Sequence, residues 1–368
     1  MATAMTPAQQ QAMAIQQDAM LTAALIQNST EYYVKQAPVT VSALGEQINL
    51  TMPNAGIMLS MDLHVQVHMN ITATATANPI GAAGVVTNLQ TFDWYGNVRH
   101  NVSASRLQSL IGYRQGRPYN DVPTSFNRDT AGLEYNLPTA IANNVNLNFQ
   151  LHVPIAQGGG SLVGALLTQT SNGSVNVALQ TIQALVSSTN PHAPYSAGTI
   201  VVNSVTVTPY YRYLMPLSFA PQALPILSLS TAYSIQEIRS PENLTAGAQN
   251  LTNFPAARVV HSQLLDFVNG SSANFGSDLS QLDIIINGAT PLKTWTPRAK
   301  LIEQRNILGA DDIPGRYYFP YRSRPVNTAT FGSYQIQVTP STVNSGAYLI
   351  VASEMTYPMG NSLPGLTV

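Results

Sequence analysis

The residues of this chain that are best suited to chemistry are few and widely scattered. His64 and His68 stand four residues apart, a spacing that places two metal ligands on one face of a helix. The residues around them alternate between apolar and polar types as in a strand, where the two imidazoles lie two alternations apart. We therefore predict no metal site at these histidines.

Two other short patterns invite a functional interpretation, and neither is complete. Residues 158–161 read Gly-Gly-Gly-Ser, like a phosphate-binding loop, but no lysine follows them. Asp311 and Asp312 are adjacent acids beside Pro314, where carboxylates are usually solvated. The chain has no cysteine, no HExxH motif, no nucleophile elbow and no spacing that marks a catalytic triad. We predict no enzymatic activity, no catalytic residue and no cofactor.

Charged residues are unusually scarce. Only 33 of the 368 residues are charged, 9% of the chain, against roughly 25% in an ordinary soluble domain. None occurs between Glu134 and Arg212 or between Asp62 and Asp93. Because an unpaired ion is costly to desolvate whereas amides and hydroxyls can be satisfied by hydrogen bonds, this composition indicates a subunit that packs against copies of itself. The alternative is a polar β-protein with an ordinary free surface.

The basic residues cluster near the C-terminus. Residues 293–324 hold seven of the sixteen lysines and arginines. This region could meet acidic partners or lipid headgroups, but a salt-bridge zone between subunits or a solvated rim is the favoured interpretation. The net charge of −1 argues against direct nucleic-acid binding, which requires a basic surface.

The elements that position these residues begin with a helical arm. Thr6 can cap a helix, Pro7 suits its first position, and an Ala-, Gln- and Met-rich stretch follows to Ile26. Asp18 is its only charge, and an anionic bilayer would favour basic residues instead. Packing on neighbouring subunits is therefore favoured over membrane contact or disorder.

Beyond Val39 the apolar period changes from 3.6 to 2. Residues 57–72 and 145–155 alternate most clearly, and shorter alternations follow to residue 351. Short helices at 103–113 and from Thr296 interrupt the two halves at similar places. With 368 residues, these features predict an all-β chain of two antiparallel sandwiches. The first basic residue is Lys35 and no long apolar run occurs, so we expect neither a secretory signal nor a membrane span.

Several segments resemble, in the same order, those of the tectivirus major capsid proteins. They are the glutamine-rich opening at 5–13, Val-Pro-Ile-Ala at 153–156, residues 224–233, and the C-terminal run that includes Lys-Thr-Trp at 293–295 and Pro-Gly-Arg-Tyr-Tyr at 314–318. The resemblance implies two tandem eight-stranded jelly rolls, a pseudo-hexagonal homotrimer, and an icosahedral shell over an internal lipid membrane that encloses double-stranded DNA.

The resemblance also sets expectations for boundaries, partners and location. We expect an arm at 1–34 and jelly rolls at 35–216 and 217–368. The expected partners are further copies of the chain, vertex and minor capsid proteins, and the viral membrane through the arm; the expected location is the virion, and the host cytoplasm before assembly. The arm residues assigned to assembly or membrane proximity are Met13, Ile15, Met20, Leu21 and Leu25. A viral spike or other receptor-binding β-sandwich, and a polysaccharide-acting enzyme, are the alternatives.

Overall fold

The computed structural model describes residues 6–116, 136–158, 161–168, 174–216, 229, 231–240, 244–270, 279–288, 290–309, 313, 315–321, 325–331 and 333–358. Some sequence expectations fall elsewhere. Asp311 and Asp312, Gly159 and Gly160, and most of the Pro-rich passage after Pro216 lie outside the described residues.

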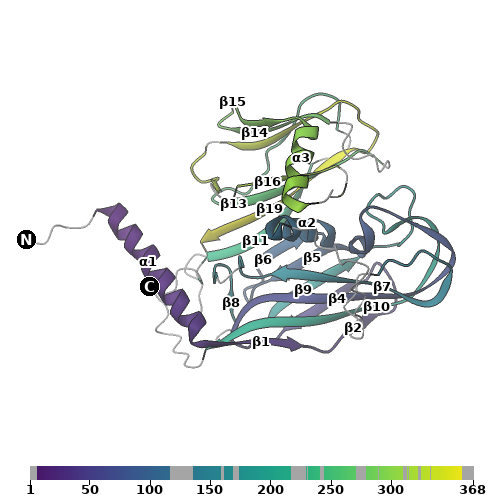
Figure 1. The fold of residues 1–368 in the computed structure, drawn as a ribbon, viewed down its shortest axis with the longest axis horizontal. Coiled ribbons are helices and arrows are strands. Elements are labelled where there is room, and N and C mark those ends of the chain that lie inside the picture. Colours follow the sequence, from purple (N-terminus) through teal and green to yellow (C-terminus); the bar gives the residue numbers. More distant parts are fainter. Residues whose placement is uncertain are drawn as a thin grey trace, which may run out of the picture.

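The arm is a single helix, α1 (Pro7–Gln27), that projects away from the body of the molecule (Figure 1). Its first turn is closed by a capping box, in which the Gln9 amide donates to Thr6 Oγ1 and the Thr6 amide donates to Gln9 Oε1 over 2.9 Å. Asn28 caps the other end. The predicted start and end of this helix are confirmed.

The first sandwich is built on two long strands, β4 (Ile57–Ala77) and β10 (Tyr195–Pro216), which pair antiparallel along most of their length. Together with β1 (Ser29–Lys35) and β7 (Ala142–Pro154) they form a sheet in the order β1-β10-β4-β7; β2 (Val39–Val41) adds to β10 and β8 (Leu166–Leu167) to β4. Every second residue of β4, from Leu63 to Ile71, is buried in the core. The alternation read from the sequence thus marks the buried face.

A nine-stranded sheet faces this one and continues into the second sandwich (Figure 1). The first half supplies β3 (Gln47–Met52), β9 (Val175–Thr181), β5 (Val86–Phe92) and β6 (Val98–Val102). The second half supplies β11 (Thr231–Arg239), β19 (Tyr348–Pro358), β13 (Val259–Val268) and β16 (Arg316–Pro320), with β17 (Val326–Asn327) paired to β13. The halves join where β6 and β11 pair in parallel through Ile235 and Gln236.

A smaller sheet completes the second sandwich in the order β12-β18-β14-β15. Its strands are β12 (Gln249–Leu251), β18 (Tyr334–Pro340), β14 (Leu279–Ile286) and β15 (Thr290–Trp295). A separate apolar core fills this half, with Leu282, Ile284 and Ile336 fully buried in it. Two sandwiches with separate cores agree with the predicted duplication.

Three short helical segments accompany the sheets: η1 (Gly81–Val85), α2 (Ala104–Gln115) and α3 (Pro297–Leu308). The helices α2 and α3 are the two that the sequence predicted, and Thr296 caps α3 as expected. In Figure 1 they lie close together where the two sandwiches meet. Among the helices in the described part of the chain, none has the length and apolarity to cross a membrane.

Candidate functional site

The seam between the two sandwiches begins at His100, which is fully buried in β6. Its Nδ1 accepts a 3.1 Å hydrogen bond from the backbone amide of Ile235 in β11, and its Nε2 lies 2.5 Å from the carbonyl oxygen of Pro154 in β7. One ring nitrogen must accept while the other donates, so the geometry requires neutral imidazole. Burial, together with the neighbouring Arg99 and Arg114, lowers the pKa of His100 to about 4. One side chain thus ties together backbone from three strands.

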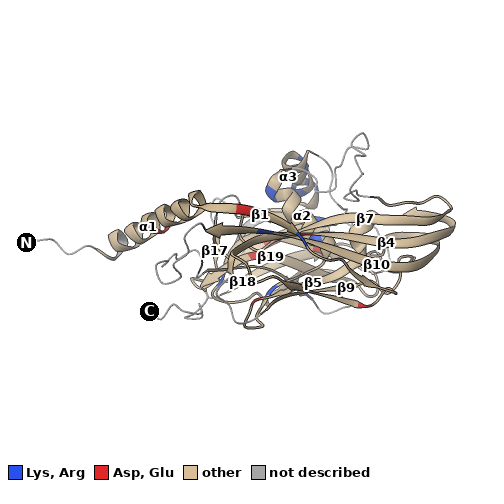
Figure 2. Ribbon diagram, turned by 90° about the horizontal axis from the view of Figure 1, so that it is seen from below, with Lys and Arg blue, Asp and Glu red and all other residues tan. Residues whose placement is uncertain are grey.

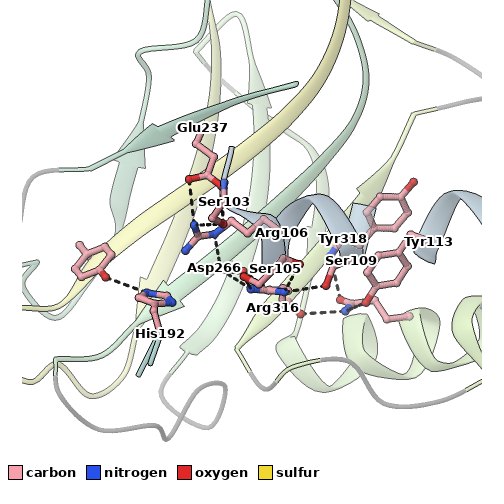
Figure 3. Close-up of polar contacts among 12 residues, drawn as sticks. Ser103, Ser105, Arg106, Ser109, Tyr113, His192, Glu237, Asp266, Arg316 and Tyr318 are labelled. Atoms are coloured by element: carbon pink, nitrogen blue, oxygen red, sulfur yellow. Dashed lines mark hydrogen bonds and ion pairs between the residues drawn. The ribbon is translucent and has the colours of Figure 1, made fainter. Parts of the chain in front are cut away.

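Arg106 is the first of two buried arginines that cross the seam. The Ser103–Tyr113 stretch forms a helix that packs between the sandwiches, so α2 turns Arg106 towards the second half (Figure 3). Its Nε donates to Asp266 of β13 over 2.6 Å, and its Nη1 donates to Glu237 of β11 over 3.1 Å. Because the guanidinium is planar and always charged, it can hold two carboxylates at once.

Arg316 of β16 meets the same carboxylate from the other side. Its Nε donates to Asp266 Oδ1 over 2.8 Å and its Nη2 to Oδ2 over 3.2 Å, which makes a bidentate pair. Its Nη1 also donates to Ser109 Oγ and to the carbonyl oxygen of Ser105, both in α2. All these groups are buried or partly buried. Arg316 therefore fastens α2 to the second sandwich.

The electrostatics of this cluster are balanced around Asp266. Burial opposes ionisation of the carboxyl group, but the guanidiniums of Arg316 and Arg106 outweigh it and hold the pKa of Asp266 below its usual value. Asp266 thus remains a carboxylate between two cations. Removing that negative charge would leave two buried guanidiniums without their shared partner.

A second polar cluster connects the end of α2 to the second sandwich. The Arg114 guanidinium forms an ion pair with Glu354 of β19 and donates to the Tyr233 hydroxyl of β11. Ser262 Oγ donates to the other carboxylate oxygen of Glu354 over 2.6 Å. Glu354 is buried, which disfavours its charge, yet Arg114 and Ser262 hold its pKa below the usual value. Both ends of α2 are therefore anchored across the seam.

An aromatic and polar contact beside these clusters joins α2 to β16 and, through Gln304, to α3. The rings of Tyr113 and Tyr318 stack with centroids 4.2 Å apart and an interplanar angle of 6°. Gln304 of α3 donates to the Tyr113 hydroxyl over 2.5 Å and accepts from the Tyr318 amide over 3.1 Å. The two short helices thus form one polar and aromatic joint.

The favoured interpretation of the basic cluster at 293–324 is wrong for two of its residues. Arg316 is buried within the chain rather than at a rim or between subunits, and Lys300 is fully buried. The Lys300 ammonium lies 4.6 Å from the centroid of the Trp295 ring and 3.0 Å from a carboxylate oxygen of Glu303. Tertiary packing uses these cations internally, where paired charges and aromatic faces replace water. Arg322 and Arg324 lie outside the described residues.

Sequence reasoning missed the seam because no local pattern marks it. Ser103, Ser105, Arg106, Gln108 and Ser109 make α2 look like a helix with a solvated polar face. The partners of Ser103, Ser105, Arg106 and Ser109 across the seam lie on strands more than a hundred residues away, and Gln108 donates to the carbonyl oxygen of Gln150 in β7. Among the charged residues that the structure describes, eight are buried: Asp93, Arg99, Arg106, Asp266, Asp283, Lys300, Arg316 and Glu354. Figure 2 marks the sparse Lys, Arg, Asp and Glu positions along the ribbon, and burial of these eight withdraws part of that charge from the surface.

The structure separates the five predicted arm residues into two groups. Met13, Ile15 and Met20 are 54%, 59% and 60% exposed, whereas Leu21 is partly buried and Leu25 is buried. Leu25 packs in a small apolar cluster with residues of β4, β8 and β10. The arm is thus anchored at its C-terminal end, and its N-terminal part presents apolar side chains to solvent.

The histidines considered as metal ligands have other roles. His68 Nδ1 lies 2.9 Å from the Asn146 side chain, and His64 is buried in β4. Within the described residues, no group of three or more His, Asp or Glu side chains is placed to hold a metal ion. The polar residues of the seam fix the two sandwiches together.

Comparison with known proteins agrees with this architecture. Residues 230–362 match the family model of the P3 major capsid protein C-terminal region. The major capsid protein P3 of Enterobacteria phage PRD1 is 25% identical over 374 residues, a match that spans 95% of this chain and 94% of that protein. The resemblance to the tectivirus major capsid proteins is confirmed. The chain is homologous to major capsid protein P3.

Solved structures show the same fold at low sequence identity. A chain from the Sulfolobus Turreted Icosahedral Virus superposes with a TM-score of 0.66 at 14% identity and covers 92% of this chain and 94% of its own. The major capsid protein P2 of bacteriophage PM2 has a TM-score of 0.51 at 8% identity, with 89% and 97% coverage. The predicted all-β double jelly roll with an N-terminal helix is confirmed. The role of the chain is that of a structural capsid protein.

Proposed function

We propose that this chain assembles as a homotrimeric capsomer, with six jelly rolls in a pseudo-hexagonal outline, and that capsomers tile an icosahedral shell over a lipid membrane. The polar seam supports this proposal. Arg106, Arg316 and Asp266 hold the two jelly rolls in one fixed arrangement, and a lattice unit must present its two halves in a reproducible geometry. The proposed division is an arm at 1–34 and jelly rolls at 35–216 and 217–368.

The surface supports self-association as the mode of assembly. The chain has few charged residues, and eight of those that the structure describes are buried, so fewer ions remain to be desolvated when subunits pack together. The homologues are virion capsid components. Vertex and minor capsid proteins belong to the proposed assembly, as does a cytoplasmic pool of subunits before it forms.

The arm is proposed to lock neighbouring capsomers together or to approach the membrane. Met13, Ile15 and Met20 expose large apolar side chains on a helix whose only charge is Asp18. Burying such side chains against another subunit contributes roughly 1.5 to 3 kcal/mol each, which offsets the ordering of the arm. The anchored end at Leu25 directs the helix away from its own body.

Light scattering with negative-stain imaging tests the proposal. A species of about three times the 39.5 kDa chain mass, with a hexagonal outline, is expected; a stable monomer would contradict it. Deleting residues 1–30 should leave trimers and abolish shells. Deleting only residues 1–20 removes the exposed apolar side chains but spares the anchor at Leu25, and it should have the same effect. The matched control replaces Met13, Ile15 and Met20 with leucine, which keeps an apolar helix and should preserve shells. Shells formed by both deletions would refute the locking role.

A further inference from the structure

A groove of about 480 Å³ opens over the seam, beside the polar cluster described above. It is lined by the first turn of α2, the C-terminal end of β11, the start of β19 and the loop that carries His192. The described groups along it include Arg106, Arg239, Glu237, His192 and Tyr348. None of these residues has a role in the capsomer proposal beyond joining the jelly rolls.

The first turn of α2 carries no side-chain cap at this groove. Ser103 stands at the N-cap position, but its hydroxyl donates to Glu237 over 3.0 Å and accepts from Arg106 over 2.9 Å instead of accepting from a helix amide. The amides of the first turn of a helix point outward and carry partial positive charge. Glu237 accepts from the Ser103 amide over 2.7 Å, which places one carboxylate at this end already.

A buried cation adjoins the same end of the helix. Arg106 is 3% exposed, and its Nη2 donates to no acceptor among the described residues, although its Nε and Nη1 are paired. Figure 3 shows Arg106 between Glu237 and His192, which both line the groove. A buried N–H without an acceptor is costly, so an additional anion or polar group at this position is favoured.

Among the described residues around the groove, cations outnumber carboxylates. Arg106, Arg316 and Arg239 contribute three cations here, and Glu237 and Asp266 contribute two anions. Burial, together with the neighbouring arginines, lowers the pKa of His192 to about 3. His192 is therefore neutral, and its Nε2 lies 3.1 Å from the Tyr348 hydroxyl.

Arg239 supplies an exposed cation at the rim of the groove. Its guanidinium carbon lies over the Tyr348 ring, 3.7 Å from the centroid, and the residue is exposed at the surface. A guanidinium held in this way is suited to a carboxylate or phosphate, which it can bind through two parallel hydrogen bonds.

We propose that this groove binds an anionic group, a carboxylate or a phosphate, between the Arg239 guanidinium and the N-terminal end of α2, with Arg106 behind it. The anion supplies the acceptor that Arg106 Nη2 lacks among the described residues. Two sources supply this chemistry: a free phosphate ion, and a carboxylate side chain of a second copy of the chain. The second source rests on the proposed assembly; the first does not.

The chain offers a matched control for the test. Arg258 stacks on Tyr357 with its guanidinium carbon 3.8 Å from the ring centroid, the same contact as that of Arg239, but it does not line the groove. Arg239→Gln and Arg258→Gln therefore remove equivalent cation–π contacts. Circular dichroism melts of both variants verify that each is folded before binding is measured.

Calorimetric titration of the purified protein with inorganic phosphate tests the first source. Wild type and Arg258→Gln should bind phosphate with one saturable site, and Arg239→Gln about tenfold more weakly or not at all. If the anion is instead a carboxylate side chain of a second copy, phosphate should bind none of the three proteins, and only Arg239→Gln should lower the yield of trimers or shells. Equal behaviour of the two variants in both assays overturns the site.

Native mass separates failure of the site from failure of the proposed function. Trimers of all three proteins with no difference between the variants would reject the anion site and leave the capsomer intact. A monomeric wild type would reject the capsomer, and phosphate titration would still decide the site.

Discussion

Replacing Asp266 with asparagine removes one negative charge from the centre of the seam with almost no change in volume. Arg106 and Arg316 donate three hydrogen bonds to its two oxygens across 2.6 to 3.2 Å, two of them from the bidentate pair with Arg316. The NH2 group of the new asparagine then faces the N–H donors of the guanidiniums in place of an accepting oxygen. Because breaking a buried ion pair by removing one partner leaves an uncompensated charge, we expect a loss of about 3 to 5 kcal/mol in unfolding free energy.

Glu31→Gln provides the control. Glu31 and Arg212 form a similar pair with Nε to Oε1 at 2.5 Å, but their side chains are 49% and 44% exposed. Water and salt screen this pair, so its loss should change the unfolding free energy by at most about 1 kcal/mol. Geometry is comparable in the two pairs, and burial is the difference that the comparison measures.

Urea unfolding at neutral pH, followed by tryptophan fluorescence, measures both effects. Trp94 lies in the first half and Trp295 in the second, so variants that keep only one tryptophan report each jelly roll separately. In wild type the two transitions should coincide, and in Asp266→Asn they should separate as the jelly rolls lose their coupling. A shift no larger than that of Glu31→Gln, with coincident transitions, would refute the role of the seam.

Two further outcomes follow from the same geometry. The pKa of His100 is lower in the folded chain, about 4, than its ordinary 6.5, so its contribution to stability is complete above pH 6.5 and is lost as the pH falls towards 4, by about 3 kcal/mol. Urea midpoints across this range should fall in wild type and change less in His100→Gln; parallel curves would contradict this. Gly164 has a φ of +84° and no room for a Cβ beside Tyr233, whereas Gly96 has a φ of +80° and open space. Thermal melts should therefore show Gly96→Ala losing about 1 kcal/mol and Gly164→Ala about 2 kcal/mol more, and equal losses would exclude the steric cause.

Much of the fold was predictable because it depends on local periodicity and on helix ends. The alternation in residues 57–72 marks the buried face of β4, since successive side chains of a strand point to opposite sides. Thr6 and Thr296 cap the helices that they were predicted to cap, because a cap is satisfied by amides within three residues. The apolar character of the arm, including Met13, Ile15 and Met20, can likewise be read from its own segment.

The long-range chemistry was decided by the tertiary structure alone. Arg106 and Arg316 are 210 positions apart, and only the parallel junction of β6 with β11 brings them to one carboxylate. The sequence shows a polar helix and a basic cluster, the patterns of solvated surfaces. Burial reverses that expectation, because a charge leaves water only where a distant strand supplies its counter-ion. The scarcity of charge was a property of the sequence by itself; which charges remain outside was settled by folding.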